Sequence, residues 1–176
     1  YFPTRGMQLR LGYLWNFTDF KSPLTDSGLH ILTGSVKGVL STGKIFSFIP
    51  SLSIRYLFGD SEPVVFANVV GGSLPGRYFE QQLPFVGLLR TTFLDRRLTL
   101  ARGDFRFNVY GNHYVTGIFN YLYSNSSFEY IKQGKGIFGA GLEYSYDTIV
   151  GPISANVHWS SLTNSVGVYC SLGYNF

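Results

Sequence analysis

The sequence is poor in charge, has one cysteine and contains no long hydrophobic run. Charged residues make up 14% of the 176 residues, against about a quarter in typical water-soluble domains, so groups that hydrate a surface are scarce. The single Cys170 excludes an intramolecular disulfide and a cysteine-rich metal site. Uninterrupted apolar stretches of about 18 residues are missing, which excludes a transmembrane helix. The first residues also lack the pattern of a signal peptide.

Basic residues and potential catalytic groups are scattered rather than clustered. Apart from Arg96-Arg97, the Lys and Arg side chains that give the net charge of +4 are spread singly, which argues against a nucleic-acid interface. The three histidines have no metal-ligand spacing, and no Gly-x-Ser-x-Gly motif is present. We therefore expect no catalytic residues, no metal and no cofactor in this chain, and no enzymatic activity of its own.

Alternation of apolar and polar residues is the dominant pattern. Aromatic residues reach 18% of the chain, and apolar side chains recur at every second position. This pattern predicts eight strands, at residues 7–17, 28–40, 44–58, 98–109, 113–123, 137–146, 153–160 and 166–176. Residues 59–97 form a connection far longer than a hairpin needs, which is typical of a functional loop.

The second face of these strands distinguishes a membrane barrel from a soluble one. It holds Gly, Ser, Asn, Tyr and a few Arg or Asp rather than the Lys, Glu and Thr of a solvated sheet. The apolar faces suit the roughly 9–11 tilted residues that cross a bilayer, and Tyr and Trp gather toward strand ends as in an aromatic girdle. The sequence therefore predicts an all-β transmembrane antiparallel barrel with its apolar face toward lipid. A soluble lipid-binding barrel is the alternative.

Three separated motifs resemble one family of barrels. The stretch GAGLEYSYDTIVGPISAN at 139–156, together with the aromatic C-terminus, resembles the last strands of the BamA/TamA superfamily of outer-membrane barrels. The opening YFPTRG resembles the Phe-Pro-Thr-x-Gly element at the middle of those barrels. GGSLPGRY at 71–78 occupies the place of the inward-folding loop, although its tip departs from the Val-Arg-Gly-Phe/Tyr pattern. The wider stretch GGSLPGRYFEQQLPFVG is similar to barrels fused to bacterial patatin-like phospholipases.

The resemblance implies that residues 1–176 are one barrel domain, the second half of a sixteen-stranded barrel, with the long loop 59–97 folded inward. It implies a bacterial outer membrane and a role in membrane-protein insertion or translocation, or in anchoring and exporting a fused lipase. Its partners would be outer-membrane lipids, the barrel-assembly machinery and an unfolded polypeptide or the lipase domain, and no nucleic acid.

The resemblance also implies site residues. Gly76, Arg77 and Tyr78 would form the loop tip in the lumen, where a buried guanidinium needs a carboxylate. Asp104 and Glu143, on the non-lipid faces of later strands, are the candidate partners of Arg77. The closing residues Tyr174 and Phe176 would act as the C-terminal assembly signal.

Other interpretations remain open at this stage. Arg102, Asp104 and Arg106 alternate along one strand and are expected to form a structural ion-pair network in the lumen. An eight-stranded lipid-modifying enzyme that uses His158 with Ser154 or Ser160, or a small porin-like barrel, is the alternative function.

Overall fold

The computed structural model describes residues 5–16, 28–59, 66–72, 81–88, 90–125, 134–149 and 151–173. Within these ranges no helix has the length and apolar character needed to cross a membrane. The strands are β1 (Arg5–Asn16), β2 (Leu29–Thr42), β3 (Phe46–Phe58), β4 (Asn68–Val70), β5 (Gln82–Leu83), β6 (Thr92–Leu94), β7 (Arg97–Tyr110), β8 (His113–Asn125), β9 (Lys135–Thr148), β10 (Gly151–Ser160) and β11 (Val166–Leu172).

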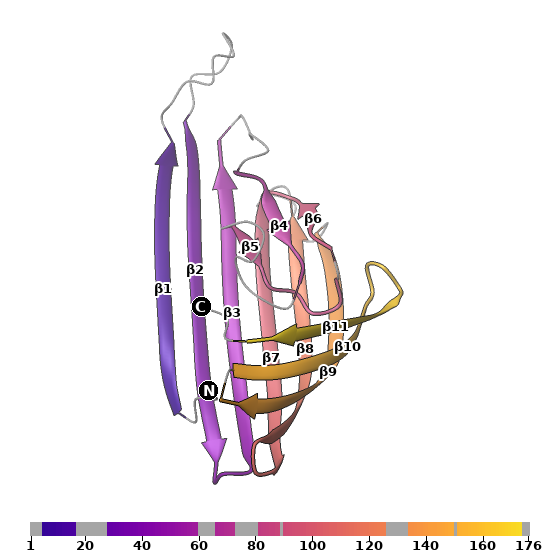
Figure 1. Ribbon diagram of the computed structural model, residues 1–176. Helices are drawn as coiled ribbons and strands as arrows, with labels where there is room; N and C mark the ends of the chain where they lie inside the picture. Colours follow the sequence, from indigo (N-terminus) through magenta and orange to yellow (C-terminus); the bar gives the residue numbers. More distant parts are fainter. Residues whose placement is uncertain are drawn as a thin grey trace.

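Eight long strands form one antiparallel sheet in the order β1-β2-β3-β7-β8-β9-β10-β11. The order follows the chain except between β3 and β7, where the intervening residues leave the sheet. The sheet twists and curls so that β9, β10 and β11 run crosswise to β1 and β2 (Figure 1). The prediction of an all-β antiparallel barrel wall with eight strands is confirmed.

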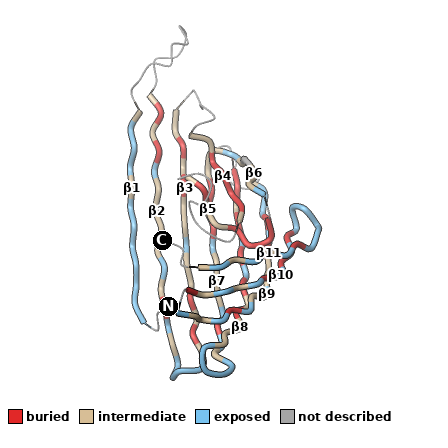
Figure 2. The backbone as a smooth tube through the Cα atoms, in the orientation of Figure 1, coloured by how far each residue is buried: buried red, intermediate tan, exposed pale blue. Residues whose placement is uncertain are grey.

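Side chains alternate between two faces of this sheet, as the period of two requires. We call the face without covering segments the outer face. It exposes large apolar side chains on edge and central strands alike, including Met7 (75% exposed), Leu142 (61%) and Val166 (69%). Exposed residues run along nearly the whole of β1, whereas β3 is mostly intermediate or buried (Figure 2). Continuous apolar exposure of this extent marks a membrane or partner surface, and it agrees with the predicted lipid-facing side.

The opposite, inner face is covered in part by the segment between β3 and β7. The described parts of that segment, residues 66–72, 81–88 and 90–96, are here called the inward segment. It contains a small sheet in the order β5-β4-β6. Its Val70, Phe85 and Leu88 pack with Leu98, Leu100, Leu122 and Ile137 of the wall. The predicted inward-folding loop is confirmed over these residues.

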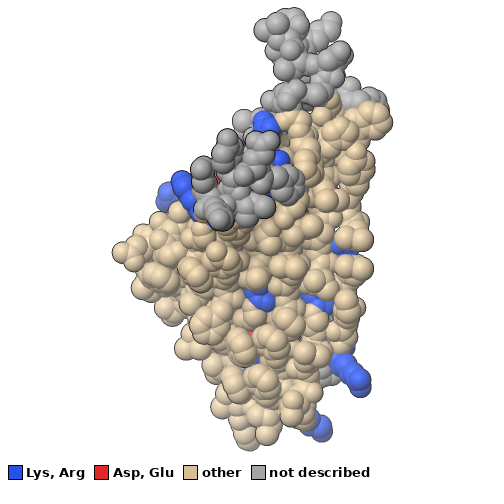
Figure 3. Space-filling view, turned by 180° about the vertical axis from the view of Figure 1, so that it is seen from behind, with Lys and Arg blue, Asp and Glu red and all other residues tan. Residues whose placement is uncertain are grey.

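The apolar part of the inner face differs from the sequence-based expectation of a small and polar lumen lining. Leu29, Ile31 and Leu57 form a second buried cluster with Phe66 packed against it. These leucines and isoleucines break the simple apolar-out pattern because the inward segment, rather than lipid, covers them. Away from these two clusters the inner face mixes polar side chains such as Ser35, Lys37 and Ser51 with single apolar ones such as Val39 and Ile49. Seen from behind, the molecule shows scattered basic side chains and very few acidic ones on a mostly uncharged surface (Figure 3).

Candidate functional site

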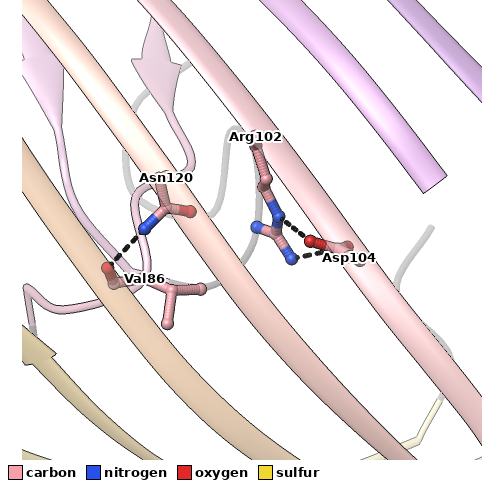
Figure 4. A network of polar contacts seen from close by, with 4 residues as sticks. All are labelled: Val86, Arg102, Asp104 and Asn120. Atoms are coloured by element: carbon pink, nitrogen blue, oxygen red, sulfur yellow. Dashed lines mark hydrogen bonds and ion pairs between the residues drawn. The ribbon is translucent and has the colours of Figure 1, made fainter. Parts of the chain in front are cut away.

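The inward segment is held on the inner face of β8 by one buried hydrogen bond. The amide Nδ2 of Asn120 donates to the carbonyl oxygen of Val86 at 2.6 Å (Figure 4). Asn120 is only 3% exposed, so this bond is shielded from water. A buried amide that lost its partner would carry an unfavourable desolvation term, so the bond selects this docked position.

Glycines in β9 make room for that contact. A Cβ atom at Gly139 would collide with the carbonyl oxygen of Val86 and would lie 2.8 Å from Cε1 of Phe85. At Gly141 it would lie 2.6 Å from Cγ1 of Val86. Glycine inside a strand often marks a close backbone approach, and both positions fit that rule. The sequence showed these glycines but not which backbone comes close to them.

Glycine is also required on the inward segment itself. Gly87 has φ of +118°, a conformation that side-chain-bearing residues rarely adopt. A Cβ atom there would lie 2.6 Å from the carbonyl oxygen of Trp159 in β10. The turn at residues 86–87 therefore lies against the backbone of β10 as well as β8 and β9.

A second set of contacts fastens the ends of the inward segment. Arg55 Nη2 donates to the Phe66 carbonyl at 2.9 Å, and the Leu57 amide donates to the Arg96 carbonyl at 2.9 Å. Asp95 accepts a bond from the Ser124 hydroxyl at 3.1 Å through Oδ2. The inward segment is thus tied to β3 and β8 near one end of the wall.

A pair of opposite charges lies next to this docking site. Arg102 donates from Nε to Asp104 Oδ1 at 2.7 Å and from Nη2 to Oδ2 at 3.0 Å (Figure 4). This bidentate geometry confirms the predicted lumenal ion pair for these two residues. Arg106, on the same face of β7, places its guanidinium carbon 5.9 Å from the ring centre of Tyr114.

The sequence-predicted loop-tip partners both lie on the inner face. Asp104 is engaged by Arg102, whereas Glu143 of β9 accepts the Ser145 hydroxyl at 3.1 Å. The loop-tip residues Gly76, Arg77 and Tyr78 lie outside the described residues, as do Tyr174 and Phe176. Pairing of Arg77 with either carboxylate, and the C-terminal assembly signal, therefore stay predictions.

The structure does not bring the alternative His-Ser pair together. His158 Nδ1 lies 2.7 Å from Asn156 Oδ1. The hydroxyl of Ser154 bonds to Ser171, and that of Ser160 to Thr163. In the described part of the chain, no group of three or more His, Cys, Asp or Glu side chains is placed to hold a metal ion.

Aromatic clusters occupy both ends of the outer face. His30 stacks between Tyr13 and Trp15, with centroid distances of 6.0 and 5.8 Å. At the opposite end His113 stacks on Tyr146 at 4.6 Å and lies 2.6 Å from the Tyr144 hydroxyl through Nδ1. Amphipathic rings at the two ends of an apolar face suit two membrane–water interfaces.

The two edges of the sheet complete the arrangement. Within the described residues, β1 pairs only with β2 and β11 only with β10. A strand at a sheet edge presents backbone N–H and C=O groups that can pair with another strand. The wall therefore combines an apolar outer face, a partly occupied inner face and strand-pairing edges.

Comparison with known proteins agrees with this architecture. A family model described as the OMP85 superfamily matches residues 1–176, the whole chain. No curated protein matches it.

Proposed function

The chain belongs to the OMP85 superfamily, and we propose that it forms the part of an outer-membrane barrel where polypeptides are inserted or translocated beside strand β11. Members of this superfamily are bacterial outer-membrane proteins that work with assembly machinery and polypeptide substrates. Membership supports an insertion or translocation barrel in general.

The position of β11 at a sheet edge is the observation that carries this proposal. It pairs with β10 over Val166–Leu172, and Val166, Val168 and Leu172 expose their side chains on the outer face. A short edge strand with a lipid-side apolar row can add an extended polypeptide by backbone hydrogen bonding while the added side chains meet lipid.

The occupied inner face supports a barrel of more than eight strands. Eight strands enclose an interior just wide enough for the side chains of their own wall. Here the inner face also carries the inward segment, in which Val69, Val70 and Phe85 are fully buried. We infer that strands outside the described sheet complete the barrel. This argues against the independently closed eight-stranded enzyme.

The inward segment would stabilise the wall next to the edge strand β11. Its contacts reach β8, β9 and β10, the three strands that precede β11. We propose that Arg77 at the loop tip adds a charged contact on this face, with Glu143 as its partner, because Asp104 is already bound bidentately by Arg102.

Anchoring and export of a fused patatin-like phospholipase is the narrower form of this proposal. It rests on the likeness of GGSLPGRYFEQQLPFVG to the barrels of that group. It predicts a hydrolase domain on the same polypeptide, which the sequence of the complete gene would reveal.

Site-specific photo-crosslinking tests the role of β11. A photoreactive residue at Val168 in β11 is compared with one at Phe119 in the interior strand β8, because their side chains are 61% and 59% exposed on the same face. We expect an unfolded outer-membrane polypeptide to cross-link at position 168 during its insertion, and lipid alone to contact position 119. Equal cross-linking at both positions would contradict the proposal.

A further inference from the structure

The inner wall is divided into a charge-balanced half and a half that carries only cations. On β7 and β9 the cations Arg102 and Arg106 share the face with Asp104 and Glu143. Strands β1, β2 and β3 contain no Asp or Glu at all. Their inner face carries Arg10, Lys37 and Arg55.

Two of these cations are free within the described part of the chain. Arg55 is buried and bound to the Phe66 carbonyl. Arg10 and Lys37 are exposed, and neither forms a hydrogen bond, an ion pair or a ring contact with the described residues. Two exposed cations on strands that hold no Asp or Glu give this face a positive potential, which attracts anionic ligands.

The register places these cations close together. Arg10 lies opposite Ser35, and Lys37 lies opposite Gln8. Arg10 and Lys37 are therefore diagonal neighbours on one face, a relation that separates residues by about 7–8 Å. Like charges at this spacing repel each other, so an anion bound between them would relieve the repulsion.

Polar uncharged groups continue the surface across the wall. The row Gln8, Lys37, Ser51 and Arg102 crosses four strands in register, and Ser35 lies opposite Ser53 in the adjoining row. Hydroxyl and amide groups can both donate and accept hydrogen bonds, as an extended peptide backbone requires.

The inward segment leaves this surface open. Its main contacts are with β7, β8, β9 and β10. On β2 and β3 its described residues reach only Leu29, Ile31, Arg55 and Leu57, at one end of those two strands. Gln8, Arg10 and Lys37 remain exposed. We call the inner-face residues Gln8, Arg10, Ser35, Lys37, Ser51 and Ser53 the basic wall.

We propose that the basic wall binds acidic segments of a polypeptide that enters the barrel lumen. The two cations lie in adjacent rows among hydroxyl and amide groups that continue across β2 and β3, which suits an extended chain that carries carboxylates and backbone amides along its length. This inference rests on the translocation part of the proposed function, because it requires a polypeptide that passes the inner face of the barrel, and it adds a preference for acidic sequence.

Peptide binding to the complete protein in detergent micelles tests the proposal. The probes are fluorescent peptides of equal length that alternate Ser with Glu, Gln or Lys, and binding is followed by anisotropy. We expect the Glu peptide to bind, with an affinity that falls as salt is raised, and the Gln and Lys peptides to bind at least about tenfold more weakly.

A matched pair of double variants assigns the binding to the basic wall. R10Q/K37Q removes one Arg and one Lys from the inner face, and R5Q/K44Q removes the same two charges from a strand end and a turn. We expect about a tenfold loss of Glu-peptide affinity in R10Q/K37Q and none in R5Q/K44Q. The reversed variant R10E/K37E should prefer the Lys peptide, provided that circular dichroism shows an intact sheet.

Two outcomes would overturn the inference. One is a Glu-peptide affinity that is equal in R10Q/K37Q and R5Q/K44Q. The other is that inorganic phosphate, or vesicles with anionic headgroups, displaces the labelled Glu peptide as well as the unlabelled Glu peptide does at equal charge concentration. The wall would then be a general anion site. Crosslinking at Val168 is measured separately, so failure of the proposed function and failure of this preference are distinguishable.

Discussion

Replacement of Gly139 by alanine should release the inward segment from the wall. The added Cβ would collide with the Val86 carbonyl and lie 2.6 Å from Asn120 Nδ2, the two groups that form the buried bond. It would also lie 2.8 Å from the ring of Phe85, which is fully buried. The backbone oxygen cannot move away without lifting the whole turn at residues 86–87.

The expected cost follows from the groups that would lose their contacts. Loss of a partner for a buried amide costs about 1–3 kcal/mol, and exposure of a buried Phe side chain about 1.5–3 kcal/mol. The docked state should therefore lose about 2.5–6 kcal/mol, which corresponds to an opening equilibrium larger by about 10²- to 10⁴-fold.

Hydrogen–deuterium exchange measures this opening directly. The amides of Gly71, Gly72 and Phe85 are protected by bonds of 3.1, 2.8 and 3.0 Å to carbonyls within the inward segment. Where opening is in rapid equilibrium, their exchange should accelerate by the same factor in Gly139→Ala. Amides of the β2–β3 pairing provide an internal reference for the rest of the wall.

Gly117→Ala is the matched control for this experiment. It lies on the outer face of the neighbouring strand β8, and the nearest atom to its added Cβ is Phe119 Cε2 at 3.8 Å, an ordinary contact. Exchange at Phe85 that is equal in the two variants would refute the argument that Gly139 holds the docking site open.

Three further substitutions test other parts of the wall. Asn120→Ala should remove the donor to Val86 without a steric clash. Exchange at Phe85 should accelerate by about fivefold, less than in Gly139→Ala, because only one buried hydrogen bond of about 1 kcal/mol is lost. Asp104→Asn should lower the free energy of unfolding in urea by about 1.5–3 kcal/mol because Arg102 loses its charged partner. The double variant with Arg102→Gln should recover part of this loss, and additive effects of the two substitutions would contradict direct coupling. Leu142→Arg on the outer face should make the free energy of folding into lipid vesicles less favourable by about 2–4 kcal/mol, whereas Ser51→Arg on the inner face should leave it unchanged. Equal effects of the two substitutions would refute the assignment of the lipid-facing side.

The placement of residues on the two faces could be predicted with few errors. Met7, Leu142 and Val166 lie outward as their spacing indicated, since neighbouring residues of a strand point to opposite sides whatever the rest of the fold does. Strands joined by short turns lie next to each other in the sheet, because a short turn cannot reach a more distant strand. Leu98 and Leu122 were missed as inner-face core because a leucine that faces lipid and one that faces a folded-in segment look alike in sequence.

The docking site for the inward segment could not be predicted. Asn120 and Val86 are 34 residues apart, and Gly139 is farther along the chain than either. The glycines of β9 were expected only on the non-lipid face, and nothing local identified the turn at 86–87 as the group that comes close to them. The ion pair of Arg102 and Asp104 was within reach of sequence reasoning because the two residues share one face of one strand.

The sequence by itself determined an alternating, apolar-faced chain of antiparallel strands with one long insertion, because strand periodicity and turn chemistry act over a few residues. Only the tertiary structure decided which half of the inner wall that insertion covers and which half it leaves basic and open. That division depends on contacts between segments that are distant in the chain. The missing Cβ at Gly139 and the buried amide at Asn120 hold the insertion on one half, and the register of Arg10 with Ser35 places the basic side chains on the other.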